Sequence, residues 1–177
     1  MSAASAKRLL GLLVLPILIS CATARTAGPP AKVLEGVPFY AQEAYQCGPA
    51  ALAGVMNFWG VDVTPEDIAG EIFSGRARGT LNIDLALYAR GRGLQARYFA
   101  GTLDDIRGAI DAGYPPIVLV DLGLWLYRKD HFMVVVGYSE GGLIVNSGRE
   151  EHKFVPLDDF MRSWKRAESW TLLVKAP

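Results

Sequence analysis

The sequence predicts an α+β domain in which helices come first along the chain and an antiparallel sheet follows. Two patterns support this order. Apolar residues recur at helical spacing in the first half, and short β-branched runs bounded by turn residues fill much of the second half. Hydrophobic residues make up 51% of the chain and charged residues 20%, a balance typical of folded globular proteins.

Three helices are predicted in the first half. Residues 48–59 carry apolar side chains at helical spacing, with Pro49 in the first turn, where its missing N–H is harmless. Thr64 reads as an N-cap before an acidic first turn, opening a helix that runs to about Phe73. A third helix is expected over residues 81–89, ended by the glycines that follow.

The second half alternates strands with two further helices. Strands are predicted over residues 94–100, 117–122, 131–138, 143–146 and 170–175, and helices over residues 102–112 and 157–164. The strands over 131–138 and 143–146 flank Glu140-Gly141-Gly142, which favours a hairpin with a glycine turn. No internal repeat is visible.

The chain is expected to have three parts. Residues 1–21 have the pattern of an export signal, with Lys7 and Arg8 before an apolar run that is too short to span a bilayer. Residues 22–32 have little periodic pattern and are expected to be a flexible linker. Residues 33–177 are expected to form one folded domain with room for a substantial core.

Cys21 ends the predicted signal in the sequence Leu-Ile-Ser-Cys, which resembles the bacterial lipobox. In that motif the cysteine receives diacylglycerol before cleavage, and the acyl chains hold the protein at a membrane. Ala22 resembles the residue that follows this cysteine in lipoproteins of the outer membrane. We therefore expect a lipid-anchored protein of the bacterial cell envelope that faces the periplasm. An ordinary cleaved signal and a buried cysteine are the alternatives.

Charge and composition exclude several classes of function. The chain has 18 Lys and Arg and 18 Asp and Glu, so it has no net positive charge that would attract it to nucleic acid. With Cys21 set aside as acylated, one cysteine, two histidines and scattered carboxylates do not have the pattern of a zinc site. We expect no metal and no cofactor.

Cys47 stands at the start of the first predicted helix. Unpaired N–H groups and the positive end of the helix dipole stabilise an anion there, so a thiol at this place is expected to have a lowered pKa. If Cys21 is acylated, Cys47 has no disulfide partner in an oxidising compartment. The position therefore indicates a nucleophile, with a neutral buried cysteine as the alternative.

His131 opens the predicted strand His-Phe-Met-Val-Val-Val-Gly-Tyr. A base held on a strand can face a thiol held on a helix with little loss of order. The alternative is a half-buried histidine whose ring bonds a carbonyl. The other histidine, His152, lies in a charged stretch and is expected at the surface.

Two segments together resemble a known family. Val-Pro-Phe-Tyr-Ala-Gln ending at Gln42, followed by Tyr-Gln-Cys-Gly-Pro-Ala-Ala-Leu around Cys47, and the downstream strand that starts at His131 are similar to the double-glycine leader peptidases. These are papain-like cysteine peptidases that trim bacteriocin precursors, often within an ABC exporter. The resemblance covers the chain from about Val37 to the last strand. It implies a papain-like fold, with the cysteine on N-terminal helices packed against a sheet that carries the histidine.

The resemblance also implies a role for each matching residue. Cys47 would attack the carbonyl carbon, His131 would carry the proton, and Gln42 would stabilise the oxyanion. The family usually has an aspartate at the end of the strand after the histidine strand, and this chain departs from that pattern. Asn146 is the favoured third residue and Ser147 its rival, and strand alternation alone does not decide between them.

The function implied is a cysteine peptidase that acts on a peptide or protein in the cell envelope. The chain has no ATPase motif of the Gly-x-x-x-x-Gly-Lys-Ser/Thr type, so it does not have the pattern of an exporter. One alternative is an acyl-transferring enzyme of the same fold. The other is a non-catalytic module that holds a peptide in the corresponding cleft.

Overall fold

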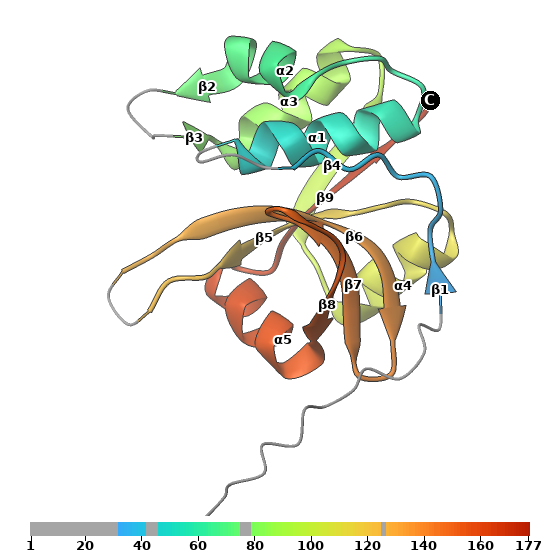
Figure 1. Ribbon diagram of the computed structural model, residues 1–177. Helices are drawn as coiled ribbons and strands as arrows, with labels where there is room; N and C mark the ends of the chain where they lie inside the picture. Colours follow the sequence, from blue (N-terminus) through green and yellow to red (C-terminus); the bar gives the residue numbers. More distant parts are fainter. Residues whose placement is uncertain (1–31, 42–45, 75–78, 125–126) are drawn as a thin grey trace, which may run out of the picture.

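The computed structural model of the protein describes residues 32–41, 46–74, 79–124 and 127–177 (Figure 1). The described helices are α1 (Cys47–Phe58), α2 (Pro65–Ile72), α3 (Asn82–Gly91), α4 (Leu103–Asp111) and α5 (Leu157–Arg166). The described strands are β1 (Lys32–Val33), β2 (Phe73–Ser74), β3 (Gly79–Thr80), β4 (Gln95–Ala100), β5 (Ile117–Asp121), β6 (Asp130–Ser139), β7 (Gly142–Ser147), β8 (Glu150–Pro156) and β9 (Trp170–Lys175).

The main sheet has seven strands in the order β4-β9-β5-β6-β7-β8, and β1 pairs with β6 beside this path. All of its strand pairs are antiparallel. The helices α1, α2 and α3 form a layer above the sheet, whereas α4 and α5 lie below it (Figure 1). The predicted α+β class, with N-terminal helices packed on an antiparallel sheet, is confirmed.

Local sequence signals account for where α2 and α4 begin. Thr64 accepts a hydrogen bond from the N–H of Asp67, and the Asp67 carboxylate accepts one from the N–H of Thr64. Thr102 and Asp105 form the same reciprocal pair before α4. This capping box satisfies N–H groups that have no partner inside a helix.

The β8 strand was not predicted, because its sequence lacks the alternation of a half-buried strand. Its first four residues, Glu150-Glu151-His152-Lys153, are all exposed. The strand lies at the edge of the sheet and pairs only with β7, so its charged side chains remain in water. Short strands such as β1, which pairs two residues with β6, also carry too little pattern to be predicted.

The helix α1 packs against β6 and against the segment that precedes it in sequence. A Cβ atom added at Gly54 would lie 2.5 Å from the carbonyl oxygen of Pro38, so the absence of a side chain lets this segment lie directly on α1. A Cβ atom at Gly48 would meet Phe132 Cδ2 at 3.3 Å. Gly48 therefore sets how closely the start of α1 approaches β6, and Gly54 sets how closely the later part of the helix approaches the segment at Pro38.

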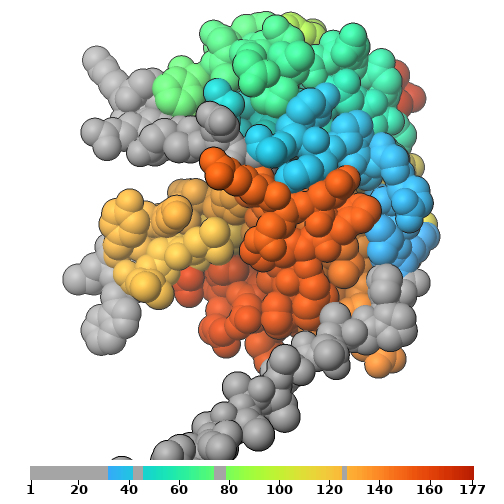
Figure 2. All heavy atoms as spheres, in the orientation of Figure 1, coloured from blue at the N-terminus to red at the C-terminus, as the bar shows by residue number. Residues whose placement is uncertain are grey.

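The space-filling view shows an indentation between the helical layer and the β5–β6 part of the sheet (Figure 2). The start of α1 faces the sheet on this side of the molecule (Figure 1). Within the described residues, no helix combines the length and the apolar character needed to cross a membrane.

We expect Gly54→Ala to lower the free energy of unfolding by about 1–3 kcal/mol, because the added methyl group collides with the Pro38 carbonyl. Urea denaturation followed by tryptophan fluorescence measures this change. Gly70→Ala is the matched control, since Gly70 lies in α2 with no atom within 4 Å of the added Cβ. That variant should be more stable by up to about 1 kcal/mol, and equal effects at the two glycines would contradict the packing argument.

Candidate active site

Cys47 is the first residue of α1, as the sequence predicted. Its sulfur accepts hydrogen bonds from backbone N–H groups, and that of Phe132 on β6 lowers the thiol pKa the most among them. Phe132 directly follows His131, so the thiol lies beside the strand residue that carries the imidazole. The close packing of Gly48 against the Phe132 ring holds the start of the helix at this point.

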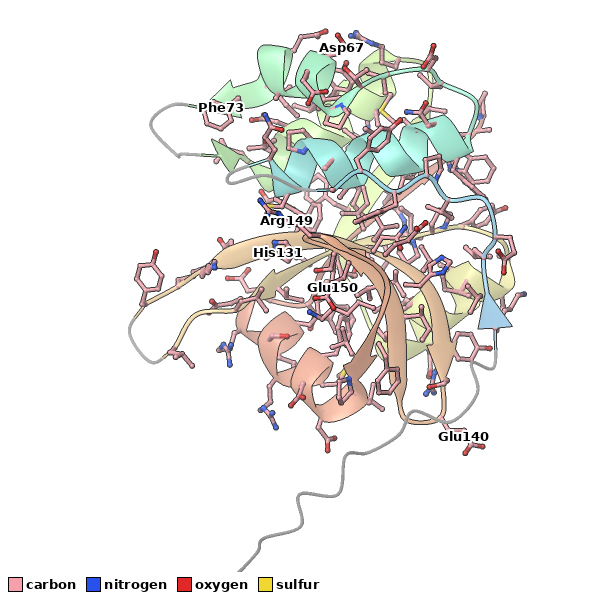
Figure 3. All side chains as sticks on the ribbon, viewed as in Figure 1. Asp67, Phe73, His131, Glu140, Arg149 and Glu150 are labelled. Atoms are coloured by element: carbon pink, nitrogen blue, oxygen red, sulfur yellow. The ribbon has the colours of Figure 1, made fainter. Side chains whose placement is uncertain are left out.

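His131 is the second residue of β6 and lies below α1 in Figure 3. Its Nε2 atom is 2.9 Å from the Ser147 hydroxyl oxygen at the end of β7. Since Nε2 is engaged by Ser147, Nδ1 is the ring nitrogen that remains for another partner. The structure thus places Ser147 of β7 against His131 of β6, and Cys47 of α1 against Phe132, the residue that follows His131.

Asn146 does not share this hydrogen bond. Its Oδ1 atom accepts a hydrogen bond of 3.0 Å from the backbone N–H of His152 on β8. Its Nδ2 atom is buried and has no hydrogen-bond partner among the described residues. The Asn146 side chain thus bonds β8, whereas the Ser147 side chain bonds the imidazole. Of the two rivals, the geometry favours Ser147.

The two central groups are both neutral near pH 7. Burial raises the pKa of the Cys47 thiol above its ordinary value, and this effect exceeds the opposing contribution of the N–H groups of Phe132, Gly48 and Cys47 itself. Burial also lowers the pKa of His131 to about 4, helped by the positive charges of Lys129 and Lys153. The expectation of a lowered thiol pKa is therefore wrong, because desolvation outweighs the helix N-terminus.

Asp121 fixes the turn of chain that leads from β5 into β6. Its Oδ1 atom accepts hydrogen bonds of 2.8 Å and 2.9 Å from the N–H groups of Gly123 and Lys129. These N–H groups, followed by the nearby Arg166, lower the pKa of the Asp121 carboxyl. Because Asp121 pairs with Asp130 in the sheet, this clamp also holds the chain just before His131. Nothing in the sequence pattern pointed to Asp121.

Two predicted site residues lie outside the described residues. They are Gln42, expected at the oxyanion position, and Cys21, expected to carry lipid. His152 is exposed on β8, as expected. In the part of the chain that the structure describes, no group of three or more His, Cys, Asp or Glu side chains is placed to hold a metal ion.

The sequence profile of the peptidase C39-like family matches residues 34–171. The chain belongs to this family. The resemblance to double-glycine leader peptidases is thereby confirmed, and the family and fold are those of peptidases. No protein among those with curated functions shows significant similarity to the chain.

Solved structures of peptidase domains share the fold. A double-glycine motif protease from an AMS/PCAT transporter, in complex with its leader peptide, has a TM-score of 0.66 and 22% identity over 83% of this chain and 96% of its own. A C39-like peptidase from Bacillus anthracis has a TM-score of 0.68 and 16% identity over 82% and 98%. The peptidase domain of Streptococcus ComA has a TM-score of 0.67 and 20% identity over 80% and 100%.

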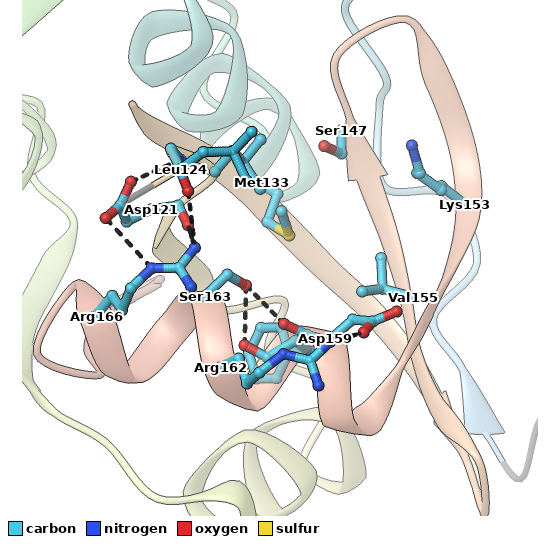
Figure 4. A pocket seen from close by; sticks show the side chains of 13 residues that line it. Asp121, Leu124, Met133, Ser147, Lys153, Val155, Asp159, Arg162, Ser163 and Arg166 are labelled. Carbon is cyan, nitrogen blue, oxygen red and sulfur yellow. Dashed lines mark hydrogen bonds and ion pairs between the residues drawn. The ribbon is translucent and has the colours of Figure 1, made fainter. Parts of the chain in front are cut away.

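A pocket of about 460 Å³ adjoins the site on the side of Ser147 (Figure 4). It lies between the sheet and α5, and apolar side chains such as Met133, Val155 and Phe160 line much of it. Lys153 and Arg162 add positive charge to its wall. Sequence reasoning missed Lys153 as part of the site, because the strand that carries it was not predicted.

We expect the low pKa of His131 to make the folded state sensitive to acid. Between pH 6.5 and about 4 the unfolded chain binds a proton at this residue and the folded chain does not. The free energy of unfolding should therefore fall as the pH drops through this window, by up to about 3 kcal/mol from this residue. Urea unfolding at pH values across the window measures the loss.

The substitution His131→Gln should remove this part of the pH dependence, and His152→Gln, which changes the other histidine, should retain it. The comparison uses the difference between pH values within each variant, so an overall loss of stability in either variant does not affect it. A pH dependence in His131→Gln equal to that of the wild type would contradict burial of a neutral imidazole.

Proposed function

We propose that the protein is a cysteine peptidase of the cell envelope that cleaves a peptide or protein substrate through Cys47 and His131. The observation that supports this most is the placement of the Cys47 sulfur against the N–H of Phe132, the residue next to His131. Ser147 bonds Nε2 of the imidazole, and Nδ1 is the proposed acceptor of the thiol proton. Ser147, in place of Asn146, is the proposed third residue.

The neutral ground state of the pair determines how it would react. As the Cys47 sulfur bonds to the substrate carbonyl carbon, the thiol proton passes to Nδ1 of His131, which acts as a general base. The carbonyl oxygen gains negative charge, and the N–H of Cys47 and the side chain of Gln42 are the proposed donors to it. His131 then gives its proton to the leaving amine, and water releases the acid product from the thioester by the same route.

We expect Cys47→Ser and His131→Ala to lower the rate of substrate cleavage by about a thousandfold or more, because nucleophile and base act as one unit. Envelope proteins are incubated with each variant, and newly formed N-termini are identified by mass spectrometry. His152→Ala is the matched histidine control and should cleave like the wild type. Identical N-termini from wild type and Cys47→Ser would refute the peptidase.

That negative result would favour a second candidate, a non-catalytic peptide-binding module of the same fold. The observation that favours it is the neutrality of both Cys47 and His131, together with a serine where the leader peptidases have aspartate. The acyl-transferring alternative is separated by adding an amine, since a transferase incorporates the amine into its product and a hydrolase does not.

We further propose that the protein is anchored by lipid on Cys21, facing the periplasm from the outer membrane. The support is the lipobox-like end of the predicted signal sequence. We expect Cys21→Ser to abolish incorporation of labelled palmitate and to move the protein out of the membrane pellet, because acyl chains supply most of the attachment. Cys47→Ser changes the other cysteine and should incorporate label normally. Full labelling of Cys21→Ser would rule out this anchor.

A further inference from the structure

Ser147 belongs both to the candidate active site and to the wall of the adjoining pocket. When Nδ1 of His131 accepts the thiol proton, Nε2 carries a hydrogen and donates it to the Ser147 oxygen. The hydroxyl hydrogen of Ser147 then needs an acceptor of its own. Among the described residues, no acceptor other than the imidazole itself bonds Ser147. The hydroxyl is thus able to donate into the pocket.

The charges around the pocket favour an anion. Its two lining carboxylates, Asp121 and Asp159, are engaged by Arg166 and Arg162 respectively. The third cation, Lys153, has its partner Glu150 outside the pocket lining.

The Lys153–Glu150 pair is weak because both side chains are well exposed, at 42% and 62%. Lys153 is therefore the cation most readily available to a ligand, and Figure 4 shows its side chain on the strand next to Ser147.

The electrostatic potential at the His131 imidazole is positive, like that of the pocket wall. Among the described residues, the charges that act on the pKa of His131 are those of Lys129 and Lys153, and both are positive. The nearest acidic residue in sequence, Asp130, is ion-paired with Arg128 at 2.6 Å. A positive environment without a neighbouring anion disfavours the imidazolium that the reaction must form. A bound anion would reverse this effect.

We propose that the substrate itself supplies this anion: a carboxylate, from an acidic side chain or a chain terminus, binds between Ser147 and Lys153 and completes the catalytic site. The proposal rests on the proposed function and specifies its substrate class. The apolar surface of Met133, Val155 and Phe160 contacts the carbon chain that carries the carboxylate. A substrate without an acidic group at this position leaves the thiol unreactive.

The proton transfers are simple in this arrangement. The Cys47 proton moves to Nδ1 of His131, the imidazolium donates its Nε2–H to Ser147, and the Ser147 hydroxyl donates to the carboxylate. Ser147 keeps its own proton throughout. The carboxylate stabilises the imidazolium through this chain of hydrogen bonds, as a buried aspartate does by direct contact.

The test measures alkylation of Cys47 in the full-length protein, with sodium formate as the carboxylate probe. Iodoacetamide is added near neutral pH, and labelling of the Cys47 peptide is followed by mass spectrometry. Sodium chloride at equal ionic strength is the salt control. We expect formate to accelerate labelling saturably, by about tenfold, the change that one pKa unit produces in the ionised fraction.

Four variants determine where formate acts. Ser147→Ala should lose the formate effect, and Ser147→Asp should react quickly without formate. Lys153→Gln changes an exposed side chain and should need higher formate concentrations. Lys165→Gln is the matched control, since Lys165 is exposed on α5 outside the pocket, and it should behave like the wild type.

Equal acceleration by chloride, or full acceleration in Lys153→Gln and Ser147→Ala, would overturn the proposal. Failure of the peptidase proposal is a separate outcome, because alkylation does not depend on cleavage. A formate effect without new N-termini would support the anion site and reject the peptidase. New N-termini without any formate effect, or without enrichment of acidic residues near the cleavage sites, would support the peptidase and reject the anion site.

Discussion

The contact between the first turn of α1 and the start of β6 is the interaction on which the candidate site depends. Gly48 allows the helix to approach the Phe132 ring, and the Phe132 N–H bonds the Cys47 sulfur. The thiol comes from the helical layer and the imidazole from the sheet, so the site exists only if the two layers pack correctly. Rigid elements hold such groups more accurately than loops do.

The same packing that assembles the site also keeps Cys47 and His131 uncharged. Closing α1 onto the sheet removes water from Cys47 and His131, and the loss of solvation disfavours the charged form of each. A helix N-terminus stabilises a thiolate, but here that effect is smaller than the cost of burial. The candidate site therefore combines a thiol and an imidazole that are both neutral at rest.

Much of the fold could be predicted from sequence, because α1, α2, α4 and β6 have strong periodicity or capping signals. The charged edge strand β8 could not, since an exposed strand needs no apolar alternation. Cys47 and His131 were predicted as site residues from their motifs. The choice between Asn146 and Ser147 required the strand register, and the sign of the thiol pKa shift required knowledge of burial, neither of which a motif contains.

Ser147, as the proposed third residue, would act differently from the aspartate that the resemblance to double-glycine leader peptidases implies at this position. A carboxylate carries its charge permanently, so a cysteine–histidine pair that it orients is ready to react whether or not substrate is present. A hydroxyl carries no charge, but it can accept a hydrogen bond from His131 and donate another to a ligand at the same time. Ser147 therefore couples the imidazole to whatever occupies the pocket beside Lys153. In a peptidase with this arrangement, reactivity depends on the ligand, and selectivity follows from the same hydrogen bond that orients the base.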